Sequence, residues 1–336
     1  MTIPETMIAI AIDVPGGPEV LRPVAVPVPP CAGNEVLIRV AAAGVNGPDL
    51  AQRSGNYDPP PGASALPGLE VAGEVVATGS DVSGVSVGDR VMALTNGGGY
   101  AEYVAVPFGQ VLQLPRGWSF AEAAALPETW FTVTQTLVMR AGLAEGMYVL
   151  AHGAAGGIGG ATIQISALLG ARAIGVTSSP EKAAYALELG AYAVIDTSRE
   201  DLAARVMALT GNLGADRIVD LVGGEMTAIN VDVSARNGHI VQVSTLGGSA
   251  ARVPLRTIMA KGLTLSGSTL RPQTAATKAA IAGCIRSELL PRLTEGRLPG
   301  PRLTTFPLAE AHAAHRHMQS RTHIGKLVLL TAFRSA

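Results

Sequence analysis

The chain has 336 residues, of which 48% are hydrophobic and 15% charged, and this composition indicates a globular protein of about two domains. A net charge of −1 gives no electrostatic reason to expect a nucleic acid or an anionic membrane as partner. No apolar run reaches the roughly 18 residues that span a bilayer, no basic segment followed by an apolar one opens the chain, and two cysteines are too few for a disulfide framework or a four-cysteine zinc site. We therefore expect a soluble, cytoplasmic protein without a bound metal.

The N-terminal part of the chain is predicted to be rich in β-strands. Turns rich in Gly, Pro, Asp and Ser separate short strand-like runs at residues 7–12, 35–42, 70–77 and 89–93. Residues 121–140 are predicted to be helical, with a break near Pro127.

Strands and helices then alternate. The strands are predicted at residues 148–151, 171–176, 193–195, 217–221, 239–244 and 263–268, and the helices at 158–169, 180–189, 199–210 and 225–235. This alternation predicts a parallel sheet covered on both faces. After a helix pair at 273–296, strands at 304–307 and 326–330 flank a helix at 308–320, and we expect this tail to rejoin the N-terminal β-rich domain.

A glycine-rich turn follows the first strand of this alternation. The segment GAAGGIGGATIQIS (153–166) places Gly153, Gly156, Gly157 and Gly159 between a buried strand and a helix. Glycines let the backbone approach a pyrophosphate, and a helix N-terminus offers free N–H groups and a positive dipole end. The pattern is GxxGxxG, which differs from the commoner GxGxxG, but its strand and helix context indicates dinucleotide binding.

The next strand ends in hydroxyl residues. An acidic residue at this position usually holds the ribose 2′-hydroxyl of NAD, whereas this chain has Thr177, Ser178 and Ser179, followed by Lys182 in the first turn of the next helix. These residues favour a 2′-phosphate and hence NADP. Ordinary helix capping by Ser179 accounts for part of the same pattern, and both interpretations can hold together.

Several segments carry a resemblance to a known family, in the family's order. They are GGPEVL (16–21), AAGVNGPDL (42–50), PGLEVAGEVVATG (67–79), VGDRVMAL (87–94), GGYAEYVAVP (98–107), GAAGGIGGATIQIS (153–166) and HIGKLVLL (323–330). The chain resembles the zinc-independent, zeta-crystallin-like quinone oxidoreductase branch of the medium-chain dehydrogenase/reductase superfamily. The stretch QRSGNYDPPPGAS (52–64) is most similar to the quinone reductases induced by a tumour suppressor. The resemblance implies an α/β fold, in which a Rossmann doubly wound parallel sheet (127–266) is inserted in a GroES-like β-rich catalytic domain (1–126 and 267–336), and it implies a homodimer.

The chain departs from the zinc-dependent relatives at their metal ligands. They have a Gly-His-Glu segment where this chain has Gly68, Leu69 and Glu70, and a cysteine near the position of Asn46. They also have a four-cysteine lobe where this chain continues directly into Tyr100. Without these ligands, polarisation of an alcohol or carbonyl oxygen by zinc is not expected.

The resemblance also implies site residues. It gives Asn46 and Thr132 roles at the nicotinamide end. It implies cofactor contacts at Gly153, Ala155, Gly156, Gly157, Ile158, Gly159, Thr177, Ser178, Ser179, Lys182, Thr197, Ser244, Thr245, Ser268, Thr269, Leu270, His323 and Lys326. Relatives have tyrosine at the position of Thr197 and often asparagine at that of His323.

Other candidates come from the residues themselves. A phenol can stack on a quinone ring and donate a hydrogen bond, so Tyr57 is a candidate for the substrate pocket, although it can equally anchor its proline-rich loop. Asn46 precedes a glycine and can be an ordinary turn residue. For His312, His315 and His317 we expect a solvated helix face, because two histidines on one face without a carboxylate or cysteine make a poor metal site.

Together these observations predict an NADPH-dependent, zinc-free reductase that transfers hydride to quinones. Three alternatives remain open. One is an ene or enoyl reductase of conjugated carbonyls, and another is an NADPH-binding, crystallin-like structural protein with little turnover. The third is a one-electron quinone reductase that produces a semiquinone, which the sequence does not distinguish from two-electron transfer. The expected partners are a small-molecule quinone or conjugated carbonyl and a second copy of the chain.

Overall fold

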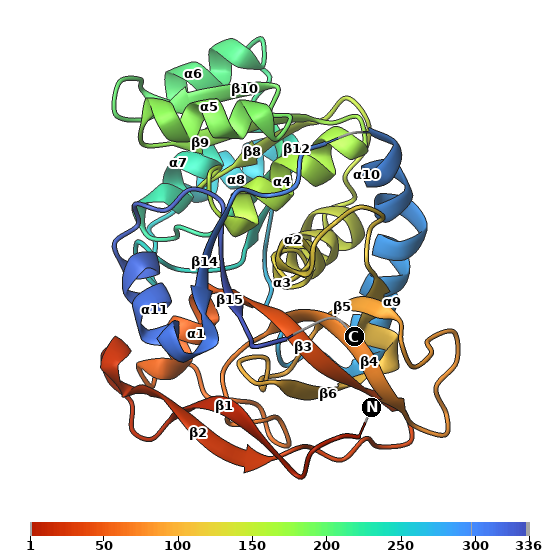
Figure 1. Cartoon of the computed structure of the whole chain (residues 1–336). Helices are drawn as coiled ribbons and strands as arrows, with labels where there is room; N and C mark the ends of the chain where they lie inside the picture. The colour runs from red at the N-terminus through yellow and green to blue at the C-terminus, as the bar shows by residue number, and fades with distance from the viewer. Residues whose placement is uncertain (1, 297, 334–336) are drawn as a thin grey trace. The chain divides into compact units, whose positions relative to one another are not determined.

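The computed structural model describes residues 2–296 and 298–333, and the chain divides into two compact units (Figure 1). Unit 1 comprises Met1–Phe131, Arg271–Ser287 and Gly300–Ala336, and unit 2 comprises Thr132–Leu270 and Glu288–Pro299. Residues 288–299, expected in the β-rich domain, belong instead to unit 2. The reason is local packing, because helix α10 contacts α4 and the Gln164 side chain donates to the Pro299 carbonyl at 3.0 Å.

Unit 1 is built on a seven-stranded sheet. Its strands run in the order β14-β15-β3-β4-β5-β7, and β6 pairs with β3. The bounds are β3 Glu35–Val45, β4 Glu70–Thr78, β5 Arg90–Leu94, β6 Tyr103–Pro107, β7 Val111–Gln113, β14 Leu303–Pro307 and β15 Lys326–Leu330. Strand β15 lies antiparallel to β3, with Leu327 opposite Val45. The prediction that the C-terminal tail rejoins the N-terminal β-rich domain is confirmed.

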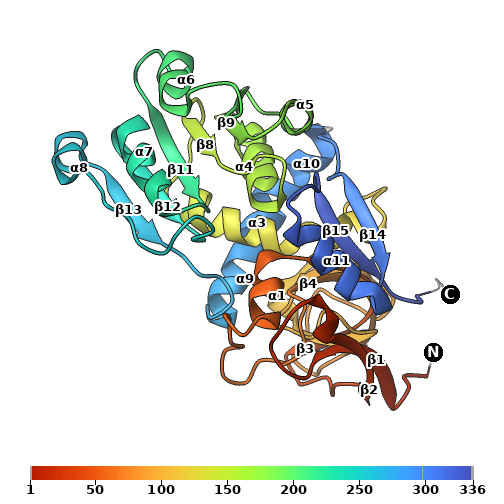
Figure 2. The ribbon, with the colours of Figure 1, turned by 90° about the vertical axis from the view of Figure 1, so that its left-hand side faces the viewer.

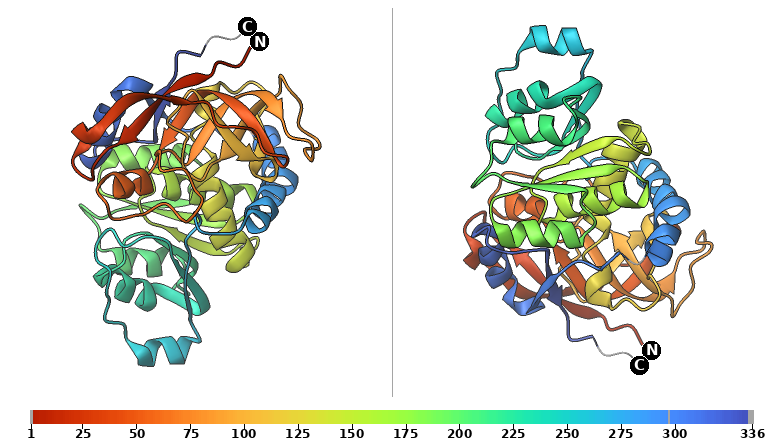
Figure 3. Two further views of the ribbon diagram at one scale, coloured as in Figure 1. Left: turned by 90° about the horizontal axis from the view of Figure 1, so that it is seen from below. Right: turned by 90° about the horizontal axis from the view of Figure 1, so that it is seen from above.

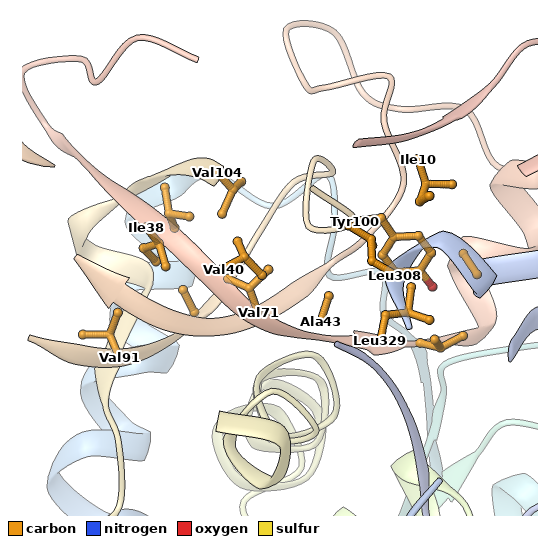
Figure 4. Close-up of a cluster of buried hydrophobic side chains, with 14 of the residues drawn as sticks. Ile10, Ile38, Val40, Ala43, Val71, Val91, Tyr100, Val104, Leu308 and Leu329 are labelled. Carbon is orange, nitrogen blue, oxygen red and sulfur yellow. The ribbon is translucent and has the colours of Figure 1, made fainter. Parts of the chain in front are cut away.

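Further elements of unit 1 surround this sheet. A two-stranded ribbon pairs β1 with β2. The bounds are β1 Thr6–Ile12, β2 Leu21–Pro27, α1 Gly47–Arg53, α2 Phe120–Ala123, α3 Pro127–Val133, α9 Ala275–Cys284 and α11 Ala311–Gln319. The chain passes into unit 2 within α3. Figure 4 shows the main apolar core of the unit, where Ile38 and Val40 of β3, Val71 of β4 and Leu329 of β15 lie together with Tyr100.

Unit 2 is a doubly wound α/β fold. All six strands of its sheet are parallel and follow the order β10-β9-β8-β11-β12-β13. The strands are β8 Tyr148–Ala151, β9 Arg172–Thr177, β10 Ala193–Asp196, β11 Ala215–Asp220, β12 Ser234–Gln242 and β13 Thr264–Gly267. The helices are α4 Gly157–Leu168, α5 Pro180–Glu188, α6 Leu202–Leu209, α7 Glu225–Val233, α8 Leu255–Lys261 and α10 Leu290–Gly296. Figure 2 shows α4 and α7 packed around this sheet. The order reverses beside β8, which is the switch point where open parallel sheets of this kind bind ligands.

The structure contains elements that the sequence did not predict. These are β2, β6, β7, α1 and α8, all of seven residues or fewer, which are too short to show a clear hydrophobic period. Helix α8 lies at the far end of unit 2 from α4 (Figure 3) and contacts β12 and α7. Within the described ranges, no helix combines the length and apolar character needed to cross a bilayer.

Candidate active site

The glycine turn of unit 2 requires glycine at two positions. Gly153 has a φ of +59°, and a Cβ on Gly159 would lie 2.3 Å from the Gly153 carbonyl oxygen. Gly156 precedes α4, and no side chain caps the first turn of that helix. Close backbone approach and uncapped N–H groups are the features that hold a pyrophosphate, so this turn, which includes Ala155, Gly157 and Ile158, fits a dinucleotide.

Hydroxyl groups gather where β9 ends. The Thr177 Oγ1 atom is buried and has no hydrogen-bond partner among the described residues. Thr197, after β10, donates from Oγ1 to the Thr177 carbonyl at 2.9 Å. Ser178 is exposed, and Ser179 accepts a hydrogen bond from the Lys182 amide at 3.4 Å and so caps α5. The predicted ribose-side residues therefore lie together within unit 2, next to a helix N-terminus.

Other predicted cofactor residues lie at the same edge of this sheet. Ser244 and Thr245 follow β12, and residues 268–270 follow β13. The carboxyl ends of parallel strands meet at one edge, which the glycine turn after β8 also occupies. The Ser268 hydroxyl donates to Gln135 Oε1 at 3.0 Å. Thr132, half-buried in α3, accepts a hydrogen bond at its carbonyl from the Thr136 hydroxyl at 2.7 Å.

In unit 1, Asn46 is part of a buried cluster of charged and polar groups. Its Nδ2 atom donates to Glu70 Oε1 at 2.7 Å, and its Oδ1 atom accepts from Lys326 Nζ at 2.6 Å. Lys326 also forms an ion pair with Glu70 Oε1 at 2.6 Å. An ammonium group can only donate and a carboxylate can only accept, so these two neighbours fix the orientation of the amide. Among the described residues, the second Nδ2 hydrogen of Asn46 is left for a further contact.

Two further carboxyl groups surround this cluster. The Glu128 amide donates to Glu70 Oε2 at 2.8 Å, and burial, followed by the charges of Glu70 and Asp49, raises the pKa of the Glu128 carboxyl to about 8. Burial raises the pKa of Asp49 to about 6, against the lowering effect of hydrogen bonds from the Asn46 and Gly68 amides. Of these two carboxyl groups, Glu128 is therefore mainly protonated at neutral pH and Asp49 is mainly ionised.

Tyr57 lies beside a buried cation. The Arg271 guanidinium carbon is 5.5 Å from the centroid of the Tyr57 ring, and its Nη1 atom donates to Gln52 Oε1 at 2.7 Å. The Arg271 Nε atom is buried without a hydrogen-bond partner in the part of the chain that the structure describes. Lys278, fully buried, donates from Nζ to the Arg271 carbonyl at 2.7 Å and to Asn96. Half-buried Tyr57 thus borders an electropositive group.

The expectation of a solvated histidine face is wrong for His315. This side chain is fully buried, with Nε2 at 3.1 Å from the Tyr100 hydroxyl and Nδ1 at 3.4 Å from Arg53 Nη1. His312 and His317 are half-buried, and the ring of His317 lies 6.3 Å from that of half-buried His323. The sequence could not reveal this because the partners of His315 come from segments far away in the chain.

The side chains around Asn46 do not fit zinc. The three side chains bonded to one another there are an amide, an ammonium group and a carboxylate that is already bound to both, whereas zinc sites use cysteine, histidine and carboxylate ligands. No group of three or more histidine, cysteine or acidic residues that could hold a metal occurs among residues 2–296 and 298–333.

Sequence reasoning missed four residues of this region: Glu70, Glu128, Arg271 and Lys278. In the sequence, Glu70 is informative only because Leu69, and not a histidine, precedes it. Lys278 lies on α9, where a single buried lysine gives no periodic signal. Arg271 follows β13 by only a few residues, and no sequence feature brings it close to Tyr57.

The comparisons with known proteins agree with this architecture. The model of the alcohol dehydrogenase GroES-like domain matches residues 32–116, and that of the zinc-binding dehydrogenase domain matches residues 157–283. A quinone oxidoreductase of Pseudomonas aeruginosa is 36% identical and covers 94% of this chain and 97% of its own length. One of Sus scrofa is 32% identical over 96% and 98%.

Solved structures of two kinds of reductase share this architecture. The structure of Escherichia coli quinone oxidoreductase complexed with NADPH has a TM-score of 0.82 at 30% identity, covering 97% of this chain and 99% of that one. The CurK enoyl reductase has a TM-score of 0.84 at 27% identity, with coverage of 98% and 100%. The chain belongs to the quinone oxidoreductase branch of the medium-chain dehydrogenase/reductase superfamily.

Proposed function

We propose that this protein is an NADPH-dependent, zinc-independent reductase of quinones. The single observation that supports this most strongly is the similarity over nearly the whole chain to quinone oxidoreductases, one of them solved with NADPH. The tumour-suppressor-inducible sub-branch remains our prediction from the loop at residues 52–64. NADPH, when bound, supplies the hydride and its electron pair, and a proton completes each reduction to the hydroquinone.

The residues of unit 2 bind the cofactor in this proposal. Gly153, Gly156 and Gly159 admit the pyrophosphate to the N-terminus of α4. Lys182 and the hydroxyl groups near it bind the 2′-phosphate, and the buried Thr177 Oγ1 atom is a hydroxyl without a partner among the described residues. Thr197, residues 244–245, residues 268–270 and His323 remain predicted contacts.

Asn46 positions the nicotinamide end, together with Thr132. Its Oδ1 and Nδ2 atoms are each held by a hydrogen bond, so its second N–H has a fixed direction. Lys326 is 5% exposed and binds Asn46 and Glu70, so we assign it the role of holding Asn46. This replaces the direct cofactor contact that we predicted for it from the resemblance.

Tyr57 and Arg271 receive the acceptor. The Tyr57 ring stacks on the quinone, and its hydroxyl donates to a quinone oxygen. The nearby guanidinium favours the oxyanion that develops on hydride transfer. A quinone needs little acid assistance, because its reduced anion is delocalised.

The test is steady-state NADPH oxidation with 1,4-benzoquinone, 9,10-phenanthrenequinone and a simple enone, each repeated with NADH and with a chelator. We expect chelator-insensitive turnover of quinones with a preference for NADPH. Turnover of the enone alone would favour the ene or enoyl reductase alternative, which the similarity to the CurK enoyl reductase also supports. Tight NADPH binding without turnover would favour a structural role, and chelator sensitivity would refute zinc independence.

The proposed assembly is a homodimer. Strand β13 is an edge strand of the unit 2 sheet, and exposed apolar side chains lie on it and on α8: Leu265 of β13, and Leu255 and Met259 (81% exposed) of α8. An exposed edge with apolar neighbours favours association between chains. Light scattering after size-exclusion chromatography should give twice the chain mass, and a monomeric mass would refute the assembly. Leu265→Lys tests the surface by shifting the dimer toward monomer.

A further inference from the structure

A chain of four buried polar side chains in unit 1 has no part in the proposed function so far. Arg53 Nη1 lies 3.4 Å from His315 Nδ1, and His315 Nε2 lies 3.1 Å from the Tyr100 hydroxyl. That hydroxyl donates to Asp49 Oδ2 at 3.2 Å. All four side chains are at most 2% exposed. We call Arg53, His315, Tyr100 and Asp49 the donor chain.

The hydrogen bonds of the donor chain all run in one direction, from Arg53 to Asp49. A guanidinium has no acceptor, so Arg53 donates and His315 Nδ1 accepts. The single Tyr100 hydrogen points to the Asp49 carboxylate, so His315 Nε2 must donate to the phenol oxygen. Every bond therefore polarises the next toward Asp49. Burial, followed by the charge of Arg53, lowers the pKa of His315 to about 3, so the ring stays neutral as this arrangement requires.

Asp49 connects the donor chain to the site around Asn46. Its carboxylate accepts from the backbone N–H of Asn46 at 2.8 Å and from the backbone N–H of Gly68 at 3.0 Å. The first bond fixes the start of α1, where Asn46 lies. The second fixes the turn that leads into β4, whose first residue is Glu70. Asp49 thus holds the two backbone segments that carry Asn46 and Glu70, whose side chains are hydrogen-bonded to each other.

We propose that Tyr100 and His315 are positioning residues for Asn46, which they hold in place through the Asp49 carboxylate. The catalytic part of this inference rests on the proposed role of Asn46. The part that concerns the order of the Asn46 segment does not. Core packing alone does not account for the donor chain. A buried polar side chain needs a hydrogen-bond partner, whereas an apolar side chain fills the core without one.

Tyr100→Phe isolates the hydrogen bonds from the packing. The Tyr100 ring lies in the apolar core with Ile10, Leu308 and Leu329, and phenylalanine fills the same space (Figure 4). Tyr103→Phe is the matched control, because Tyr103 is also a buried tyrosine of unit 1 but packs in a separate cluster around Met7.

Hydrogen exchange of the unliganded protein, followed by mass spectrometry, tests the structural part. In Tyr100→Phe we expect the peptide covering residues 42–53 to exchange on the order of 10-fold faster, because Asp49 loses one of its three donors. Tyr103→Phe should leave this peptide unchanged. Unchanged exchange in Tyr100→Phe, or equal acceleration in both variants, would overturn the inference.

A double-mutant cycle tests the catalytic part. With saturating NADPH, Tyr100→Phe should lower kcat for benzoquinone on the order of 10-fold and should add no further loss in an Asn46→Ala background. Additive losses would mean that Tyr100 acts independently of Asn46 and would overturn its positioning role. If Asn46→Ala alone keeps full activity, the role proposed for Asn46 is wrong, and the exchange result alone decides whether the donor chain orders the segment.

A pair of His315 variants covers the case in which Tyr100→Phe does not fold. Glutamine can place an N–H donor near the position of Nε2, whereas methionine has similar length and no donor. We expect His315→Gln to keep slow exchange at residues 42–53 and most of kcat, and His315→Met to lose both. Equal behaviour of the two variants would show that the donor has no role.

Discussion

Glu128 should lower the stability of unit 1 as the pH rises, and Glu128→Gln should remove this contribution. Burial and the nearby charges of Glu70 and Asp49 raise the pKa of Glu128 from 4.5 to about 8. The folded carboxyl therefore keeps its proton up to about pH 8, whereas the unfolded one loses it near its ordinary pKa. Between these values the folded state binds more protons, so rising pH favours unfolding.

The size of the effect follows from the pKa difference of about 3.5. At about 1.4 kcal/mol for each pKa unit, this corresponds to about 5 kcal/mol in total, of which about 3 kcal/mol falls between pH 5 and pH 8. Glutamine resembles the protonated acid and cannot ionise. We subtract the free energy of unfolding of the wild type from that of Glu128→Gln at each pH. This difference should therefore be about 3 kcal/mol larger at pH 8 than at pH 5.

Urea unfolding at several pH values measures this difference. Both tryptophans, Trp118 and Trp130, lie in unit 1, so their fluorescence reports on the unit that contains Glu128. Glu5→Gln, at an exposed position of the same unit, is the matched control and should follow the wild type at every pH. A constant offset between Glu128→Gln and wild type from pH 5 to pH 8 would refute the reasoning, because it would mean that Glu128 is ionised throughout.

Three further predictions concern ligand binding. Lys182→Ala should reduce the preference for NADPH over NADH, measured as a ratio of kcat/KM values, on the order of 10-fold, and an unchanged ratio would exclude Lys182 as a 2′-phosphate contact. Tyr57→Ala should raise the KM for benzoquinone much more than the Kd for NADPH, and equal losses would show that Tyr57 only anchors its loop. Gly159→Ala should weaken NADPH binding at least about 10-fold in a calorimetric titration, because its Cβ would lie 2.3 Å from the Gly153 carbonyl oxygen. Gly283→Ala, where a Cβ would meet nothing within 4 Å, should bind as the wild type does.

Much of the fold could be predicted because its signals are local. The alternation of buried strands and helices after residue 148 predicts the parallel sheet of unit 2, and the glycines at 153–159 predict the turn between β8 and α4. The short elements α1 and α8 escaped prediction, since seven residues show no clear hydrophobic period. The segment 288–299 was assigned to the wrong unit because its contact with α4 joins residues far apart in the chain.

The sequence by itself determined the architecture, through local hydrophobic patterns, and the family and cofactor, through motifs that resemble those of quinone oxidoreductases. Only the tertiary structure decided the electrostatics of the site around Asn46. Glu70, Lys326 and Glu128 lie far apart in the chain, and the pairing of β15 with β3 and of β3 with β4 brings the first two together. Burial then changes their chemistry, because a charge removed from water must find a partner or a proton. For the same reason His315, which the sequence places on a solvated face, is a neutral member of a buried hydrogen-bonded chain.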